Sequence, residues 1–81
     1  MRLATITHIT EWMQHAAATH GPFASPWHAV KAARIELMEA ELAISYEGKE
    51  RAALEMLDAA VVLIRAAEQY QKQPQPQGET K

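Results

Sequence analysis

The chain has 81 residues, a formal net charge of −2 and no cysteine. At this length it forms one domain with a modest core, so we expect oligomerisation to add buried surface. Without cysteine, disulfides and thiolate metal ligands are excluded. The slightly negative charge and the scattered Lys and Arg residues disfavour a general nucleic-acid binder. No segment reaches the about 18 apolar residues of a membrane span, so a cytoplasmic protein without a membrane partner is expected.

A first helix is predicted from residue 5 or 7 to residue 20. Apolar side chains recur there at helical spacing, at Ile6, Ile9 and Met13. Gly21 and Pro22 follow, and both residue types end helices.

A second helix is predicted to begin after Ser25, a suitable N-cap, with Pro26 in its first turn. It is predicted to end near Tyr46. Gly48 follows, and glycine readily takes the left-handed conformation that closes a helix.

The third helix is predicted from residue 49 to about residue 70, and it is apolar nearly all round. Its large side chains point in three directions: Leu54, Leu57, Val61 and Ile64 on one side, Met56 and Leu63 on another, and Val62 on a third. Such a helix is buried on most sides, which three short helices of one chain hardly achieve. The predicted fold is therefore all-α: a short helical hairpin plus an N-terminal helix, assembled into a homodimer or tetramer of the four-helix-bundle type.

The end of the chain differs in composition from the rest. Residues 71–81 are polar and interrupted by prolines. We predict a disordered tail there, which leaves residues 1–70 as the folded domain. The sequence shows neither strand alternation nor an internal repeat.

Two acidic pairs, Glu36-x-x-Glu39 and Glu55-x-x-Asp58, lie on the second and third predicted helices. Residues three apart share a helix face, so an antiparallel hairpin can bring all four carboxylates together. At separations of roughly 4 Å in a partly dry setting, like charges repel by about 4 kcal/mol per pair, so the cluster needs protons or a cation. Oxygen-only ligands favour magnesium or manganese over zinc.

The simpler alternative is that these acids are ordinary surface charges, as either pair alone would suggest. Their neighbours argue for a site instead. The second pair lies among large apolar residues, and the first is flanked by Ala32, Ala40 and Ala43. Small neighbours let another helix approach closely and leave room for an ion. Two such pairs on adjacent helices therefore favour a metal site.

The acidic pairs and their surroundings resemble the all-α nucleoside triphosphate pyrophosphohydrolases typified by MazG. That family carries ExxE and then ExxD on neighbouring helices of an oligomeric bundle, and residues 36–39 and 55–58 match this pattern. Pro26-Trp27 also resembles a Pro-Trp that some members carry ahead of the first pair. The resemblance covers roughly residues 5 to 70. One departure is Ile35, where many members have a second Glu; it bears on metal number or substrate preference.

The resemblance implies hydrolysis of a (deoxy)nucleoside triphosphate to the monophosphate and pyrophosphate, by attack at the α-phosphorus. Mg²⁺, or Mn²⁺ in its place, would be held by Glu36, Glu39, Glu55 and Asp58, which also form the catalytic centre. One of the glutamates could instead orient the attacking water or take its proton. The sequence does not assign that base.

Four further residues are candidate substrate contacts: Arg65, Lys49, Arg51 and Trp27. Arg65 lies two turns after Asp58 on nearly the same face, and a salt bridge is its alternative role. The charges at 49 and 51 are otherwise solvated turn residues. Trp27 and Trp12 could stack on a base or anchor packing. His8 and His15 share a face of the first helix, but a zinc site would need a further ligand.

Two other functions compete with the enzyme. The first is a non-catalytic helical oligomerisation or regulatory protein that retains the fold, and the second is an interaction module whose apolar third helix docks on another protein. The former predicts no metal-dependent turnover. The latter predicts exposed apolar surface in the isolated chain.

Overall fold

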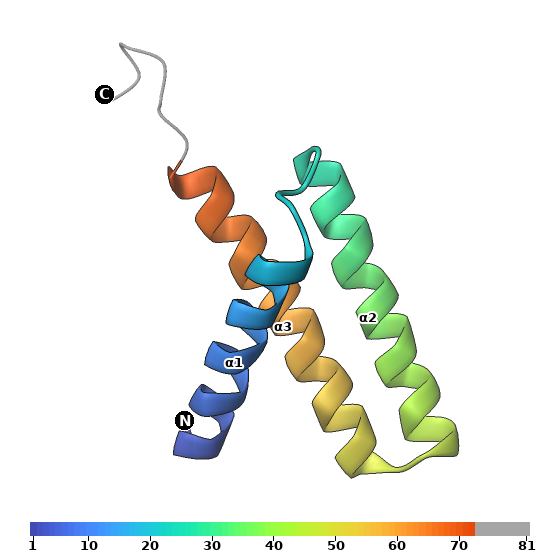
Figure 1. Ribbon diagram of the computed structural model, residues 1–81. Helices are drawn as coiled ribbons and strands as arrows, with labels where there is room; N and C mark the ends of the chain where they lie inside the picture. Colours follow the sequence, from blue (N-terminus) through green and yellow to red (C-terminus); the bar gives the residue numbers. More distant parts are fainter. Residues whose placement is uncertain (73–81) are drawn as a thin grey trace.

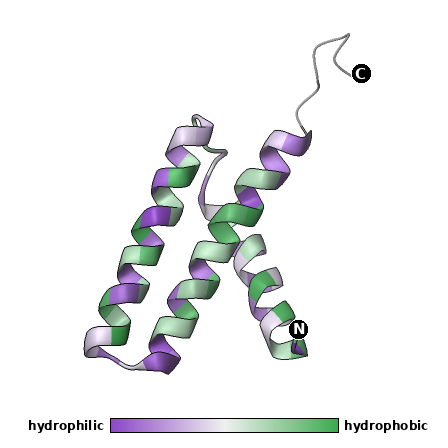
Figure 2. Cartoon of the chain, turned by 180° about the vertical axis from the view of Figure 1, so that it is seen from behind, coloured by the Kyte–Doolittle hydropathy of each residue, from purple (hydrophilic) through white to green (hydrophobic). Residues whose placement is uncertain are grey.

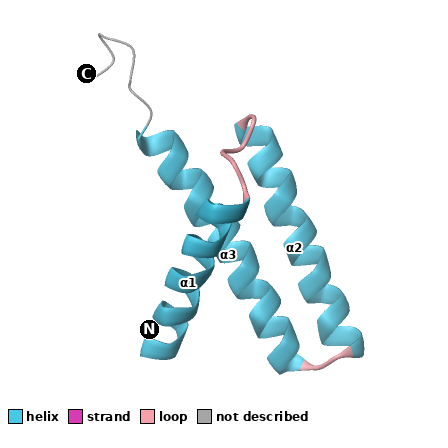
Figure 3. Cartoon of the chain, viewed as in Figure 1, coloured by secondary structure: helices cyan, strands magenta, loops and turns pink. Residues whose placement is uncertain are grey.

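The computed structural model describes residues 1–72, which form three helices (Figures 1 and 3). These are α1 (Leu3–Thr19), α2 (Pro26–Tyr46) and α3 (Lys49–Lys72). No strand occurs among the described residues. The prediction of an all-α fold with an N-terminal helix and a helical hairpin is therefore confirmed.

The helix ends follow from local sequence. The Ser25 hydroxyl accepts a hydrogen bond from the His28 backbone N–H at 3.2 Å, so Ser25 caps α2 as predicted. Gly48 has φ of 110°, a left-handed conformation that favours glycine, and its N–H donates to the Ala43 carbonyl at 2.7 Å. The turn that joins α2 to α3 is thus set by one residue.

Three helix boundaries differ from the prediction, by one to four residues. Helix α1 begins at Leu3 and ends at Thr19, after which the His20 N–H still donates to the Ala16 carbonyl at 2.8 Å. Helix α3 continues to Lys72, so residues 71 and 72 belong to it. The rest of the predicted tail, residues 73–81, lies outside the described residues.

Helices α2 and α3 pack as an antiparallel hairpin along a seam of alanines (Figure 1). The buried alanines are Ala29, Ala33, Ala40 and Ala43 on α2 and Ala52, Ala59 and Ala66 on α3. They recur at intervals of three, four or seven, which keeps one narrow stripe of each helix facing the other. Because alanine has the shortest apolar side chain, the two backbones approach closely along this seam.

Helix α1 packs on α3 and crosses it, and it makes no comparable contact with α2 (Figure 1). Its one fully buried residue is Ala16. The loop that follows is tied to the far end of α3: Gln69 Nε2 donates to the Phe23 carbonyl at 3.0 Å, and the Phe23 N–H donates to Gln69 Oε1 at 2.8 Å. Helix α1 is therefore held mainly by its C-terminal end.

One chain leaves much of its apolar surface uncovered. Leu54, Met56 and Leu63 on α3 are 41%, 50% and 49% exposed. Hydrophobic residues are distributed along all three helices (Figure 2). Within a single chain, α3 is therefore not buried on most sides. The prediction of an oligomer rests on this same expectation, that one chain does not cover its third helix. None of the helices in residues 1–72 is long and apolar enough to cross a membrane.

Candidate metal centre

The hairpin brings three of the predicted acids together. Carboxylate oxygens of Glu36, Glu39 and Glu55 all lie within 4.8 Å of one another. Asp58, one turn after Glu55, lies beside this trio, close enough for its charge to act on Glu36 and for the charge of Glu55 to act on it. The predicted set of four therefore consists of a compact trio with Asp58 at its side.

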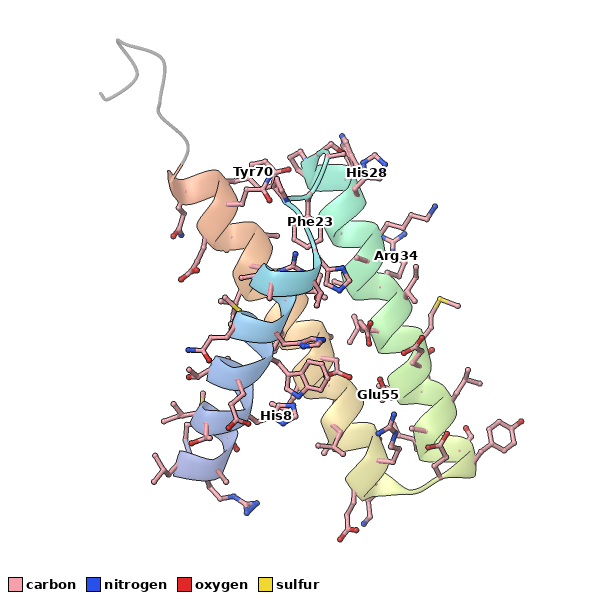
Figure 4. The ribbon with its side chains drawn as sticks, in the orientation of Figure 1. His8, Phe23, His28, Arg34, Glu55 and Tyr70 are labelled. Atoms are coloured by element: carbon pink, nitrogen blue, oxygen red, sulfur yellow. The ribbon has the colours of Figure 1, made fainter. Side chains whose placement is uncertain are left out.

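The acids converge because two of them occupy positions of the alanine seam. Glu36 takes the place between Ala33 and Ala40 in the α2 stripe, and Glu55 takes the place between Ala52 and Ala59 in the α3 stripe. The neighbouring alanines hold the backbones together at this level, so the two carboxylates face each other. Glu55 is only 7% exposed and lies between the helices (Figure 4).

The electrostatics follow from this crowding. Burial raises the pKa of Glu36, and the charges of Glu39, Asp58 and Glu55 raise it further. Burial and the charge of Glu55 likewise raise the pKa of Asp58, while His8 and Arg51 act in the opposite direction. Without a bound metal ion, the carboxyl groups of Glu36 and Asp58 therefore hold their protons more tightly than free carboxyl groups do.

Arg51 is the cation that pairs with the cluster among the described residues. Its Nη2 lies 2.8 Å from Glu55 Oε2, and its Nε lies 3.5 Å from Glu47 Oε1. One guanidinium does not neutralise four carboxylates. The residual negative charge makes the cluster suited to a divalent cation.

The geometry fits magnesium. Mg²⁺ takes oxygen ligands at about 2.0–2.1 Å, so ligand oxygens on opposite sides of the ion lie about 4.2 Å apart. The oxygens of the trio lie within 4.8 Å of one another, a limit that is a few tenths of an ångström larger than this ligand-to-ligand distance. Small side-chain movements would close that difference, and Glu39, which is exposed, leaves one side open to water or substrate.

The acids open into a cleft between the three helices. A hollow of about 200 Å³ is lined by Trp12, His15 and His20, by Glu36, and by α3 residues that include Asp58 and Arg65. A second hollow of about 470 Å³ adjoins it beside the loop at residues 20–24 and shares Glu36 and Arg65. The cleft thus offers a ligand direct access to Glu36 and Asp58.

The structure distributes the remaining candidate residues differently. Arg65 lines the cleft, whereas Arg51 is engaged by Glu55 and Glu47. Lys49 is exposed in the first turn of α3. Trp27 is 83% exposed and lines a separate hollow on α2 with Lys31 and Arg34, so it does not join the acids.

Helix α1 contributes side chains that the sequence did not assign to this site. His8 acts electrostatically on Asp58, its Nε2 is buried without a hydrogen-bond partner among the described residues, and it points from α1 towards α3 (Figure 4). The Trp12 ring lies 6.0 Å from the His8 ring and 5.1 Å from the His15 ring. The spacing of His8, Trp12 and His15 in the sequence places them on one helix face. The sequence does not show that this face packs against α3.

Comparisons with models of protein families, with curated proteins and with solved structures find no match for this chain. What the fold and the site define is an all-α protein with a carboxylate cluster in a helical hairpin, open to a cleft.

Proposed function

We propose that the protein is a magnesium-dependent nucleoside triphosphate pyrophosphohydrolase of the MazG type. It would convert a (deoxy)nucleoside triphosphate to the monophosphate and pyrophosphate and so serve nucleotide-pool control. The observation that carries this proposal is the trio Glu36, Glu39 and Glu55 within 4.8 Å, with Asp58 beside it. Glu36 and Asp58 also line the cleft. The ExxE and ExxD spacing on an antiparallel hairpin supports the same conclusion.

In this proposal Glu36, Glu39, Glu55 and Asp58 hold the ion. Bound Mg²⁺ supplies charge neutralisation of phosphate oxygens and lowers the pKa of a bound water. Arg51 fixes the orientation of Glu55 through its contact at 2.8 Å. In place of holding the ion, one of the glutamates would orient the attacking water or accept its proton.

The test is pyrophosphate release from a panel of ribo- and deoxynucleoside triphosphates, with and without Mg²⁺. We expect release that depends on magnesium and is lost in the Glu39→Gln, Asp58→Asn double variant. Circular dichroism of the variant checks that it remains helical. A folded wild-type protein that turns over no member of the panel would rule out the enzyme.

A second candidate is a non-catalytic oligomerisation, regulatory or interaction protein with the same fold. The exposed apolar residues favour it, with Trp27 83%, Met38 56% and Leu42 57% exposed on α2. The departure at Ile35 from the family pattern points the same way. This candidate predicts Mg²⁺ or nucleotide binding without hydrolysis in the same assay.

A further inference from the structure

Arg65 lines the cleft together with two acids of the cluster, Glu36 and Asp58. It follows Asp58 by seven residues, which is two helical turns and about 10 Å along α3, so both side chains project from nearly the same face. Arg65 and Glu36 line both hollows of the cleft. The cleft therefore presents both carboxylates and a guanidinium to the same space.

The guanidinium of Arg65 is held in place by uncharged partners. Its Nη2 donates to the Gly21 carbonyl at 3.3 Å, and its Cζ lies 4.7 Å from the centre of the Phe23 ring. Phe23 is itself fixed by its two hydrogen bonds to Gln69. Residues 1–72 provide no carboxylate within 4.0 Å of Arg65, since the ion pairs found there belong to Arg51. Its positive charge and most of its five N–H donors stay available to a ligand.

This layout fits an anion that also carries a divalent cation. A metal-bound polyphosphate places its ion among the carboxylates and extends further phosphate groups along the cleft. Arginine binds phosphate through paired, charge-assisted hydrogen bonds, and its rigid fork suits that geometry. The hollow beside the loop, about 470 Å³, also has His20 and His28 in its lining and provides the space for these groups.

We propose that Arg65 and this hollow form the subsite for the pyrophosphate part of the substrate, which becomes the leaving group. The inference rests on the proposed function for the identity of the ligand. This subsite would set the orientation of the nucleotide. The β- and γ-phosphates would point towards the loop at residues 20–24, and the nucleoside would point away from that loop.

The test is isothermal titration calorimetry of pyrophosphate in saturating Mg²⁺. Arg65→Gln removes the charge and keeps an N–H donor for the Gly21 carbonyl. We expect it to weaken pyrophosphate binding by about tenfold to a hundredfold, the range for a lost charged hydrogen bond. The matched control is Arg34→Gln, because Arg34 lines a separate hollow on α2; we expect it to leave the affinity within about twofold of the wild type, below the effect of one neutral hydrogen bond.

A second variant separates the charge of Arg65 from its role in holding the loop. Gln69→Ala removes both hydrogen bonds to Phe23 and leaves the guanidinium, so we expect it to weaken pyrophosphate binding much less than Arg65→Gln. Wild-type affinity in Arg65→Gln would overturn the proposal, and so would an equal loss in Gln69→Ala or Arg34→Gln.

The binding assay needs no turnover, which separates this inference from the proposed function. If pyrophosphate binding depends on Arg65 in a protein that hydrolyses no nucleotide, the subsite is supported and the proposed enzymatic function is ruled out. If the wild-type protein hydrolyses nucleotides but Arg65→Gln binds pyrophosphate with unchanged affinity, the enzymatic function is supported and the subsite proposal is ruled out.

Discussion

At the scale of single residues, Glu55 shows how the fold manages an unfavourable charge. It is 7% exposed, faces two other glutamates, and has Arg51 as its ion-pair partner among the described residues. A buried carboxylate is costly unless it is paired or bound to a cation. The same position would serve well as a ligand, because its neighbours prevent it from swinging into water.

The raised pKa values of Glu36 and Asp58 predict how metal-free protein responds to pH. Because both pKa values lie above those of the unfolded chain, the folded state binds more protons. This contribution to stability is fully present below the unfolded values of about 4 and is lost as the pH rises through the folded ones. We therefore expect the free energy of unfolding, measured in urea with a chelator present, to rise as the pH falls from neutral through the raised pKa values of these two groups.

Glu36→Gln tests the source of that dependence. It removes one titrating group and its repulsion, so we expect higher stability at pH 7 and a weaker response to pH. Glu41→Gln, at an exposed position of the same helix, is the control. Equal pH dependence in wild type and Glu36→Gln would show that the response arises elsewhere.

At the scale of elements, the alanine seam sets the spacing of α2 and α3 and so the width of the candidate metal centre. Ala59→Leu inserts a large side chain at a position that is 3% exposed. We expect a loss of about 1–3 kcal/mol of unfolding free energy from overpacking, together with weaker Mg²⁺ binding because the carboxylates move apart. Urea denaturation and calorimetry measure the two effects.

Ala53→Leu is the matched control for this substitution. Ala53 belongs to the same helix and is exposed, so an added side chain meets solvent there. We expect little change in stability or Mg²⁺ affinity. If Ala59→Leu lowered stability but left Mg²⁺ affinity intact, the spacing of the seam would not control the site.

At the scale of the whole molecule, the exposed apolar surface of α3 predicts self-association. Met56 and Leu63 lie seven positions apart on one helix face, and each is about half exposed. We expect a dimer or tetramer in size-exclusion chromatography with light scattering. Leu63→Lys places a charge on that face and is expected to shift the protein towards the monomer.

Thr10→Lys is the control for the added charge, because Thr10 is exposed on α1. It should leave the oligomer intact. A wild-type chain that stays monomeric and well behaved at high concentration would contradict the prediction of an oligomer and would leave the apolar face to another partner.

The sequence by itself determined the helices and the pairing of the acids. Ser25 and Pro26 mark the start of α2, Gly48 marks the turn, and the spacing of three within each acidic pair puts both of its carboxylates on one face. These are local signals, each of which acts over a few residues, and a short turn between two helices forces them to run antiparallel. The hairpin and its acidic centre follow from those signals.

Only the tertiary structure decided how α1 and the loop complete the cleft. The contacts of Arg65 with Gly21 and of Gln69 with Phe23 join residues more than forty positions apart, and they determine where α1 crosses α3. That crossing brings His8 close to Asp58. The docking angle of a helix depends on side-chain packing across the interface, which no local pattern encodes. For the same reason the alanines alone did not tell how closely Glu36 and Glu55 would meet.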